Sequence, residues 1–430
     1  MNYNMFLLRF GLNPDNFVNK EPSIIDSDDA VIYEVIQDIT NKRECPFCHN
    51  KKTLVKDRDL VQINASTSLG KKEFIRINKT RLKCPSCHKT FTPPIEGIER
   101  YERMNKTTIE AIRKEFFLIQ SFKQIAERFN VAIQTIINIF DEYTKYVPRR
   151  EMPEYLCIDE KHFEGDTNGK YCVVISDFFS GEVIDVLPNR QKTYLNEYFD
   201  NIPLKEREKV KVFISDMYDE YRNVKDKYFQ KALFVVDLFH VVKLISEVVK
   251  KIRIRVYNQI AEEGSIEKHF MKSNWKAFQA DLYKITNKPY TSDKFGIITT
   301  YGDMITRCIK LSNTFWDTYI VLQELIHYDK YDTYTQAEHF IKDRIIVKLE
   351  NIQDELTDKV AASYKKWLTG ICSGLAKNQT GKRFSNAIAE CNNSHIQRII
   401  DVSYGYRNFN RFRNRIMLIM TYNPYKKDTN

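Results

Sequence analysis

Hydrophobic residues between Thr107 and Tyr143 recur with a helical period. Apolar residues stand three or four positions apart at Ile109, Ile112, Phe116 and Ile119, which marks one face of a helix. Ser121 is a suitable N-cap for a second helix over 122–129, and a short turn leads to a third over 133–140. Two helices joined by such a tight turn match a helix-turn-helix, and an ordinary helical hairpin gives the same pattern.

After Pro148 the period changes to alternating strands and helices. Three apolar runs separated by short turns predict three consecutive strands, and a strand, a helix and a strand follow them. The expected strands are 155–159, 171–177, 182–187, 210–215 and 232–236, with a helix over 218–228. This is the order of the RNase H-like fold.

The remaining segments are predicted mostly from helical spacing. Residues 238–369 lack strand signals and are expected to be helical throughout, and 385–400 form a further helix. The first 40 residues are expected to be a helical lead-in, because 24–39 mixes apolar and acidic residues. Strand-like runs appear between them, at Thr53-Leu54-Val55 and Phe74-Ile75-Arg76-Ile77.

Composition places the chain among globular proteins with a basic surface. It has 430 residues, of which 43% are hydrophobic and 29% charged, and its formal net charge is +10. This charge suits a polyanionic partner, although it also fits an ordinary basic protein. No apolar run approaches the roughly 20 residues that cross a bilayer, and no signal peptide is expected. Nine cysteines, five of them scattered through apolar segments, indicate a reducing compartment.

The strongest local motif consists of two Cys-x-x-Cys pairs, Cys45/Cys48 and Cys84/Cys87. Four thiolates at this spacing predict a tetrahedral Zn²⁺ site of the ribbon type, and such a site is usually structural. Residues 49–83 leave room for a small sheet between the pairs. His49 and His88 are expected to be neighbours or phosphate contacts, and the alternative for the motif as a whole is two pairs of free cysteines.

Three acidic residues in different settings carry the candidate chemistry. Asp159 and Asp216 end apolar strands, and Glu390 lies in the late helix. A carboxylate at the end of a buried strand needs a partner or a metal. Three of them could hold two Mg²⁺ ions, with Mn²⁺ as a substitute, for phosphoryl transfer on nucleic acid. The alternative is that these acids are helix caps or loop residues.

Asp237 and His240 follow the last predicted strand and are possible neighbours of the acidic site. His240 could contact a phosphate or position a nucleophile. A packed histidine capped by Asp237 fits the same residues.

Polar and basic residues outside the acidic site suggest contacts with DNA. In the last helix of the predicted helix-turn-helix, Gln134, Thr135 and Asn138 are placed to read base edges. Arg149 and Arg150 form a basic linker, and 404–415 mixes aromatic residues with arginines that include Arg407 and Arg411. This last cluster suits stacking and backbone contacts on DNA. It equally fits a C-terminal helix that packs Phe409, Phe412 and Ile416 on the core.

The assembled motifs resemble the bacterial insertion-sequence transposases of the ISL3 type, which have a DDE catalytic domain. The resemblance covers nearly the whole chain and rests on the two cysteine pairs, the helix-turn-helix pattern and four motifs. The motifs are Ile158-Asp159-Glu160, Ser215-Asp216-Met217, Asp237-Leu-Phe-His240-Val-Val-Lys243, and the tail from Ser385-Asn386-Ala387 through Glu390-x-x-Asn393 to Tyr404-Gly405-Tyr406-Arg407-Asn408-Phe409. One departure is Cys391, where the family usually has glycine.

The resemblance implies that Asp159, Asp216 and Glu390 bind the catalytic Mg²⁺, and that the N-terminal modules bind terminal inverted repeats. It implies double-stranded DNA as the partner, both element ends and target. A homodimer or larger assembly would bring two ends together, and the protein would work in the bacterial cytoplasm at the nucleoid.

The predicted fold is therefore a multidomain α/β chain with an RNase H-like core and a large helical insertion, preceded by a zinc ribbon and a helix-turn-helix. The expected segments are 1–40 (helical lead-in), 41–95 (zinc ribbon), 104–147 (helix-turn-helix), 153–240 (first part of the core), 241–375 (helical insertion) and 380–425 (C-terminal core helices with the third acid). Two rival functions remain: a non-catalytic DNA-binding regulator derived from a transposase, and another RNase H-like nuclease. Fold alone does not separate them.

Overall fold

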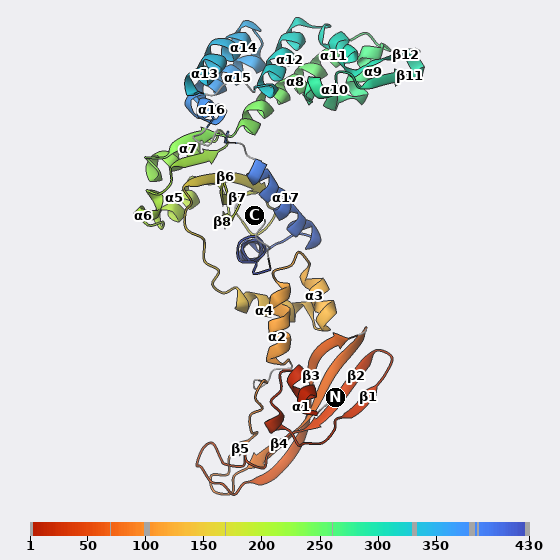
Figure 1. Ribbon diagram of the computed structural model, residues 1–430, viewed down its shortest axis with the longest axis vertical. Helices are drawn as coiled ribbons and strands as arrows, with labels where there is room; N and C mark the ends of the chain where they lie inside the picture. Colours follow the sequence, from red (N-terminus) through yellow and green to blue (C-terminus); the bar gives the residue numbers. More distant parts are fainter. Residues whose placement is uncertain are drawn as a thin grey trace. The chain divides into compact units, whose positions relative to one another are not determined.

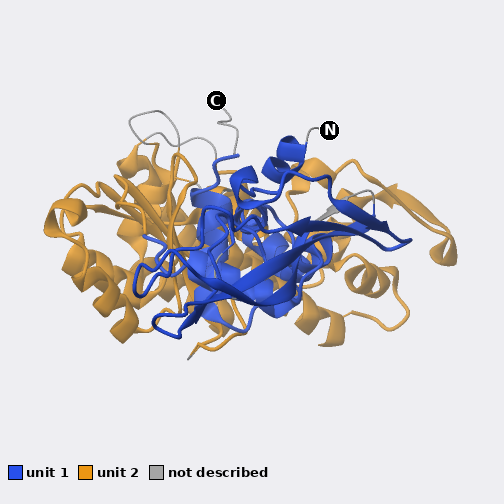
Figure 2. Cartoon of the chain, turned by 90° about the horizontal axis from the view of Figure 1, so that it is seen from below, with its two compact units in different colours: residues 1–148, 395–430 blue, residues 149–394 orange. Residues whose placement is uncertain are grey.

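A computed structural model describes residues 3–68, 70–98, 104–167, 169–259, 261–328, 333–377, 383–384 and 387–425. The chain forms two compact units (Figure 2). Unit 1 contains residues 1–148 and 395–430, and unit 2 contains residues 149–394. The C-terminal segment therefore completes the same unit as the N-terminal one.

A twisted antiparallel and parallel sheet forms the first part of unit 1 (Figure 1). Its strand order is β1-β2-β4-β3, with β5 paired to β4. Alternate residues of the long β3–β4 hairpin, such as Ile63, Ile75 and Ile77, are buried beneath α1. The elements are α1 (Tyr3–Arg9), β1 (Ser23–Asp26), β2 (Ala30–Ile36), β3 (Leu54–Ser68), β4 (Lys71–Lys83) and β5 (Thr90–Phe91).

The predicted helical lead-in is wrong beyond α1 and the short 3-10 turn at Pro14–Asn16, because residues 23–36 form strands β1 and β2. Strand β2 pairs in parallel with β4, so that Tyr33 lies opposite Ile75. This pairing supplies the backbone hydrogen bonds of β2 from a segment some forty residues away in sequence. Local hydrophobic spacing does not register such a partner.

Three helices follow the sheet in unit 1: α2 (Lys106–Glu115), α3 (Phe122–Phe129) and α4 (Ile133–Tyr143). Ser121 caps α3 in a capping box with Gln124, and Asn130 ends it in the left-handed conformation with φ of 52°. Phe116, Ile125 and Phe140 are buried between the helices. The tight α3–α4 turn expected from the sequence is therefore present.

The C-terminal helix α18 (Phe409–Ile416) and the π-helix Met417–Thr421 pack in unit 1. Phe409, Phe412 and Ile416 are buried, so the aromatic residues of this cluster serve packing. Arg415 is 1% exposed. Its guanidinium donates to the backbone carbonyls of Phe116, Leu118 and Gln120, where α2 ends and the chain turns towards α3.

A five-stranded sheet of order β10-β9-β6-β7-β8 forms the centre of unit 2. Strands β6, β7 and β8 are antiparallel neighbours, whereas β9 and β10 run parallel to β6. Helices α5 and α7 cover one face, and α17 lies on the other (Figure 1). The elements are β6 (Tyr155–His162), β7 (Tyr171–Asp177), β8 (Val183–Leu187), α5 (Lys192–Asp200), α6 (Leu204–Arg207), β9 (Val212–Ser215), α7 (Asp219–Tyr228), β10 (Leu233–Val236) and α17 (Ala387–Val402).

A helical region with its own hydrophobic core stands between β10 and α17 in the sequence (Figure 1). The expectation of helix throughout is wrong at one place, where β11 and β12 form a short antiparallel hairpin. Among the described residues, no helix is both long and apolar enough to cross a membrane. The elements are α8 (Leu238–Gln259), α9 (Ile266–Ser273), α10 (Leu282–Ile285), β11 (Pro289–Ser292), β12 (Ile297–Thr300), α11 (Tyr301–Ile309), α12 (Asn313–Ile326), α13 (Tyr334–His339), α14 (Val347–Asn351), α15 (Glu355–Lys366) and α16 (Leu368–Leu375), with a π-helix at Phe340–Ile346 and 3-10 turns at Trp275–Gln279 and Asp293–Phe295.

Candidate functional site

Acidic side chains gather where β9 and β10 end beside β6, which itself continues past Asp159 to His162. In the β6–β9 register Cys157 lies opposite Ile214, and in the β9–β10 register Ser215 lies opposite Val236. Continuing these registers brings Asp159, Asp216 and Asp237 to the same level of the sheet. The strand pairing thus gathers acids that are well separated in sequence.

Asp159 occupies the face of β6 opposite to the buried Leu156 and Ile158. Its Oδ1 accepts the backbone N–H of Glu160 at 2.8 Å, and its Oδ2 accepts Nδ2 of Asn393 at 2.7 Å. Burial raises the pKa of Asp159, the two hydrogen bonds oppose this rise, and the negative charges of Glu160 and Glu390 add to it. The carboxylate is therefore held in position within a region of excess negative charge.

Asp216 comes immediately after β9, where the chain leaves the sheet. Its Oδ1 is buried and has no hydrogen-bond partner in the described part of the chain. Burial raises the pKa of Asp216 to about 7, and the negative charges of Glu160 and Asp159 act in the same direction. A buried, unpartnered carboxylate oxygen beside other acids is a position that a cation would stabilise.

Glu390 lies in the first turn of α17 and is exposed. Asn393 follows one helical turn later, so the two residues share a helix face. Asn392 anchors the same turn by donating to the carbonyl of Gly181 at 3.1 Å. The negative charge of Glu390 contributes to the raised pKa of Asp159. Cys391 is exposed and lies outside the core.

Asn393 appears in the sequence as part of the Glu390-x-x-Asn393 motif, but its contact with Asp159 was not predicted. Its spacing of three from Glu390 was the available signal, because residues three apart on a helix reach the same neighbour. The hydrogen bond to Asp159 joins positions 234 residues apart in sequence, and no local pattern reports such a contact.

Asp237 and His240 border the acidic site. Asp237 is 1% exposed and adds to the raised pKa of Asp216. Its Oδ1 accepts the backbone N–H of Phe239 at 3.1 Å, and its Oδ2 lies 3.5 Å from Nε2 of His240. Burial lowers the pKa of His240 to about 4, so this imidazole is neutral at pH 7. This geometry matches the alternative in which His240 is a packed histidine capped by Asp237.

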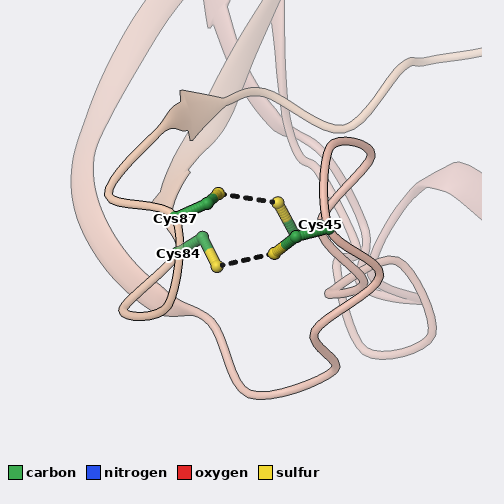
Figure 3. Close-up of side chains that lie close together, drawn as sticks. Cys45, Cys84 and Cys87 are labelled. Atoms are coloured by element: carbon green, nitrogen blue, oxygen red, sulfur yellow. Dashed lines mark hydrogen bonds between the residues drawn. The ribbon is translucent and has the colours of Figure 1, made fainter.

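Four cysteines in unit 1 form a second, tighter cluster. All four Sγ atoms lie within 4.8 Å of one another. The distances are 3.6 Å between Cys45 and Cys87 and 3.5 Å between Cys48 and Cys84. Figure 3 shows Cys45, Cys84 and Cys87 pointing into one small space. Among the residues that the structure describes, no other group of three or more Asp, Glu, His or Cys side chains lies this close together. The carboxylates of Asp159, Asp216 and Glu390 are therefore farther apart than the four thiols.

The cysteine cluster fits a tetrahedral metal. A Zn–S distance of about 2.3 Å places the four sulfurs about 3.8 Å apart. The backbone N–H of Cys87 lowers the pKa of Cys84 to about 6, whereas the neighbouring thiols raise the pKa of Cys48 to about 12. Without a metal the four sulfurs therefore share protons, and the case for a metal rests on their geometry. His49 and His88 are exposed, and both lie in the left-handed conformation with φ of 59° just after each pair. They shape the turns and stand outside the cluster.

The candidate DNA-contact residues differ in their exposure and in whether they form ion pairs. Gln134 and Asn138 are exposed on α4, where Nε2 of Gln134 donates to Oδ1 of Asn138 at 2.8 Å, while Thr135 is half-buried. Arg407 is also exposed.

Three other arginines from the predicted DNA-contact set are engaged in ion pairs. Arg149 binds Glu206 at 2.8 and 2.9 Å, Arg150 lies 2.9 Å from Glu182, and Arg411 binds Asp141 at 2.8 and 2.7 Å.

Comparisons with known proteins show the family to which the chain belongs. The family model for DDE transposases of the ISL3 type, described as "Transposase", matches residues 156–416, well over half of the chain. The chain is also similar to the transposase for insertion sequence element IS1001 of Bordetella parapertussis, with 24% identity over 208 residues. That alignment covers 47% of this chain and 50% of the relative. Asp159, Asp216 and Glu390 all fall within the family match.

Proposed function

Because this chain belongs to the DDE transposases of the ISL3 type, we propose that it binds the terminal inverted repeats of an insertion sequence, cleaves their 3′ ends and transfers them into target DNA. The observation that carries the proposal is the register of β6 and β9, which brings Asp159, within β6, level with Asp216 at the end of β9, while the charge of Glu390 on α17 acts on Asp159. Acids brought together from three separate elements have a joint role.

The sheet of unit 2 supports an RNase H-like assignment for the catalytic core. Three antiparallel strands followed by two parallel ones, β9 and β10, match the order that this fold requires. The helical region from α8 to α16 then stands as an insertion between the second and third acids of the DDE set.

We assign Asp159, Asp216 and Glu390 as the ligands of two Mg²⁺ ions, which Mn²⁺ would replace. The fit rests on the buried, unpartnered Oδ1 of Asp216 and on burial, which together with neighbouring negative charges raises the pKa of both aspartates. Bound divalent ions would supply charge stabilisation for the attacking and leaving oxygens. Asn393 orients Asp159, and the carboxylates fix the place where the phosphodiester must lie.

Two successive exchanges at phosphorus account for the reaction. Water first attacks the phosphodiester at the element end and loses a proton as a new P–O bond forms; the bond to the 3′ oxygen breaks, and that oxygen takes up a proton. The released 3′-hydroxyl then attacks a target phosphodiester, loses its proton, and displaces a target 3′ oxygen. Neither exchange requires a covalent bond between protein and DNA.

Unit 1 supplies the proposed DNA-binding modules. The cysteine cluster would hold a structural Zn²⁺ in a ribbon, and α3 with α4 would act as a helix-turn-helix. Gln134 and Asn138, exposed on α4, are placed to contact base edges, with Thr135 beside them. Arg407 would contact the DNA backbone, whereas Arg149, Arg150 and Arg411 would reach DNA only if their ion pairs opened.

If double-stranded DNA is the partner, two further properties follow, which concern the assembly of the protein and its place in the cell. Two element ends must be held at once, so a homodimer or larger assembly would carry out the reaction. The protein would act at the bacterial nucleoid.

Cleavage of a plasmid that carries the DNA flanking this gene tests the proposal. Wild-type protein with Mg²⁺ should nick at the element boundaries, and Asp216→Asn should lower the rate by more than about 100-fold. Asp219→Asn is the matched control, because Asp219 is exposed at the start of α7 and pairs with Lys366. Boundary binding without cleavage would favour a regulator, and cleavage that ignores the boundaries would favour another nuclease.

A further inference from the structure

Arg190 is held on three sides next to the acidic site. It follows β8, and its Nη1 donates to both carboxylate oxygens of Glu160 at 2.7 Å. Its guanidinium carbon lies 4.7 Å from the ring centre of Tyr218 and 5.2 Å from that of Tyr171. A planar cation between an acid and two aromatic rings has little freedom to reorient.

Glu160 forms an ion pair with Arg190, although it directly follows Asp159 in the sequence. Successive strand residues point to opposite faces, so Glu160 shares the face of Leu156 and Ile158 with α7. Its Oε1 also lies 3.1 Å from the hydroxyl of the fully buried Tyr221, which donates to it. Both oxygens of Glu160 are therefore engaged in hydrogen bonds, although its charge also adds to the raised pKa of Asp216.

Arg190 still has donors to offer. Its side chain is 38% exposed, and within the described residues its Nε and Nη2 make no hydrogen bond. The positive charge of Arg190 acts on Asp216 against the rise in its pKa, which places the guanidinium within electrostatic reach of that carboxylate. A free guanidinium edge is suited to bidentate binding of a phosphate.

The acidic site by itself repels DNA. Asp159, Asp216 and Glu390 bring negative charge to the place where a phosphodiester must enter. A cation fixed at the border of these acids would counter that repulsion on the incoming strand, next to the bond that is cut.

We propose that Arg190 binds a phosphate of the cleaved strand adjacent to the scissile bond, and that Glu160, Tyr171 and Tyr218 position its guanidinium for this contact. The inference rests on the proposed function, because the bound phosphate belongs to the DNA substrate of the same site. It assigns Glu160 to positioning, as distinct from binding metal.

Variants separate a phosphate contact from a merely structural ion pair. Arg190→Met should lower cleavage of a duplex containing one element end by about 10-fold or more. The double variant Glu160→Gln/Arg190→Met removes both charges and should stay defective. Recovery of the wild-type rate in the double variant would overturn the proposal, because it would show that Arg190 acts only by neutralising Glu160.

Neutral phosphates locate the contact directly. Replacing single phosphates near the cut by methylphosphonates should reveal one position that slows the wild-type protein and has no added effect on Arg190→Met. Equal sensitivity of both proteins at every position would overturn the proposal.

The affinity for the same duplex, measured by fluorescence anisotropy, is a readout that does not depend on cleavage. The slope of log affinity against log salt should fall by about 0.9 for one lost phosphate contact. Arg222→Met is the control, because Arg222 stacks 3.5 Å over Trp367 in the same unit and donates to the carbonyl of Lys366. An equal slope change in both variants would count against Arg190.

Wild-type protein that binds the duplex without cutting it would overturn the proposed function. The salt dependence would then still test whether Arg190 contacts a phosphate, so the two failures are distinguishable. Mg²⁺ should raise the Tm of Glu160→Gln as much as it raises that of wild type. If Glu160→Gln instead loses as much of this Tm increase as Asp216→Asn does, Glu160 is a metal ligand.

Discussion

Nδ2 of Asn393 donates a 2.7 Å hydrogen bond to Oδ2 of Asp159. This bond joins the helix that carries the third acid to the strand that carries the first. It favours the ionised form of Asp159 and fixes the direction of its second oxygen. The amide therefore keeps this carboxylate ionised and oriented, as the proposed metal site requires, without bringing charge of its own.

Replacing Asn393 should weaken divalent-cation binding. Without the hydrogen bond the pKa of Asp159 rises further, and the carboxylate is less firmly oriented. We expect Asn393→Ala to raise the Mg²⁺ concentration for half-maximal cleavage by about 10- to 100-fold, with maximal rate largely recovered at saturating metal. Gln397→Ala, which loses an exposed bond to Asp401 on the same helix, should match wild type; an unchanged Mg²⁺ requirement in Asn393→Ala would contradict the role.

The metal-free protein should lose stability as the pH rises. The folded-state pKa of Asp216, about 7, lies above its unfolded value. The fold therefore favours the protonated form, and this contribution is complete below about pH 4 and disappears as the pH passes 7. The change in the free energy of unfolding is on the order of 4 kcal/mol.

Thermal unfolding with and without Mg²⁺ measures this effect. Mg²⁺ should raise Tm more at pH 8 than at pH 6, because it competes with a proton at the lower pH. Asp216→Asn should reduce the pH dependence of the Mg²⁺ effect, since Asp159 still titrates, and Asp219→Asn should retain it in full. A Mg²⁺ shift that is equal at both pH values in wild type would be inconsistent with a titrating ligand.

Loss of one thiol should empty the proposed zinc site. Purified Cys84→Ser should contain little zinc, whereas wild type should contain one zinc per chain, because three thiolates bind much more weakly than four. The β3–β4 hairpin should then exchange amide protons faster. Cys391→Ser, which changes an exposed thiol, should keep its zinc, and full zinc content in Cys84→Ser would refute the site.

The two exposed amides on α4 should act as a pair in base recognition. Gln134 supports Asn138 through a 2.8 Å hydrogen bond, so both alanine variants should lose roughly 1–3 kcal/mol of discrimination for the inverted repeat. The double variant should lose less than the sum of the two. Competition binding against random duplex measures this discrimination. If the double variant still prefers the repeat as strongly as wild type does, α4 does not take part in sequence recognition.

Removal of Arg415 should destabilise unit 1. Its guanidinium satisfies three backbone carbonyls at the end of α2 and in the turn that follows. Arg415→Met leaves these acceptors buried and unpaired, at a cost of about 3–5 kcal/mol. Hydrogen exchange of α2 and α3 should accelerate accordingly. Arg407→Met, at an exposed position, should not change exchange, and protection equal to wild type in Arg415→Met would disprove the prediction.

Local sequence patterns predicted the positions of Asp159 and Asp216 because both follow short apolar runs. The strand expected to end at Asp159 continues to His162, so that Asp159 lies within β6. The strand before Asp216 begins at Val212, two residues later than expected from the run 210–215. The capping residue Ser121 and the tight α3–α4 turn were equally accessible, since they depend on neighbours in sequence. These features are set within a few residues of one another.

Contacts between residues distant in sequence could not be predicted from such local patterns. The pairing of β2 with β4 and the bond from Asn393 to Asp159 depend on residues distant in sequence. Arg415 stands in an apolar helix face where a charged side chain is expected to reach solvent. Only the carbonyls at the end of α2, some three hundred residues earlier, explain its burial.

The placement of Arg415 has a consequence for synthesis of the protein. The ribosome makes the α2–α4 helices early, yet the guanidinium that binds their carbonyls and the Leu418 side chain that joins their core come at the end of the chain. Incomplete chains therefore lack part of the module that would hold DNA. A truncated product would compete poorly with finished protein for the same ends.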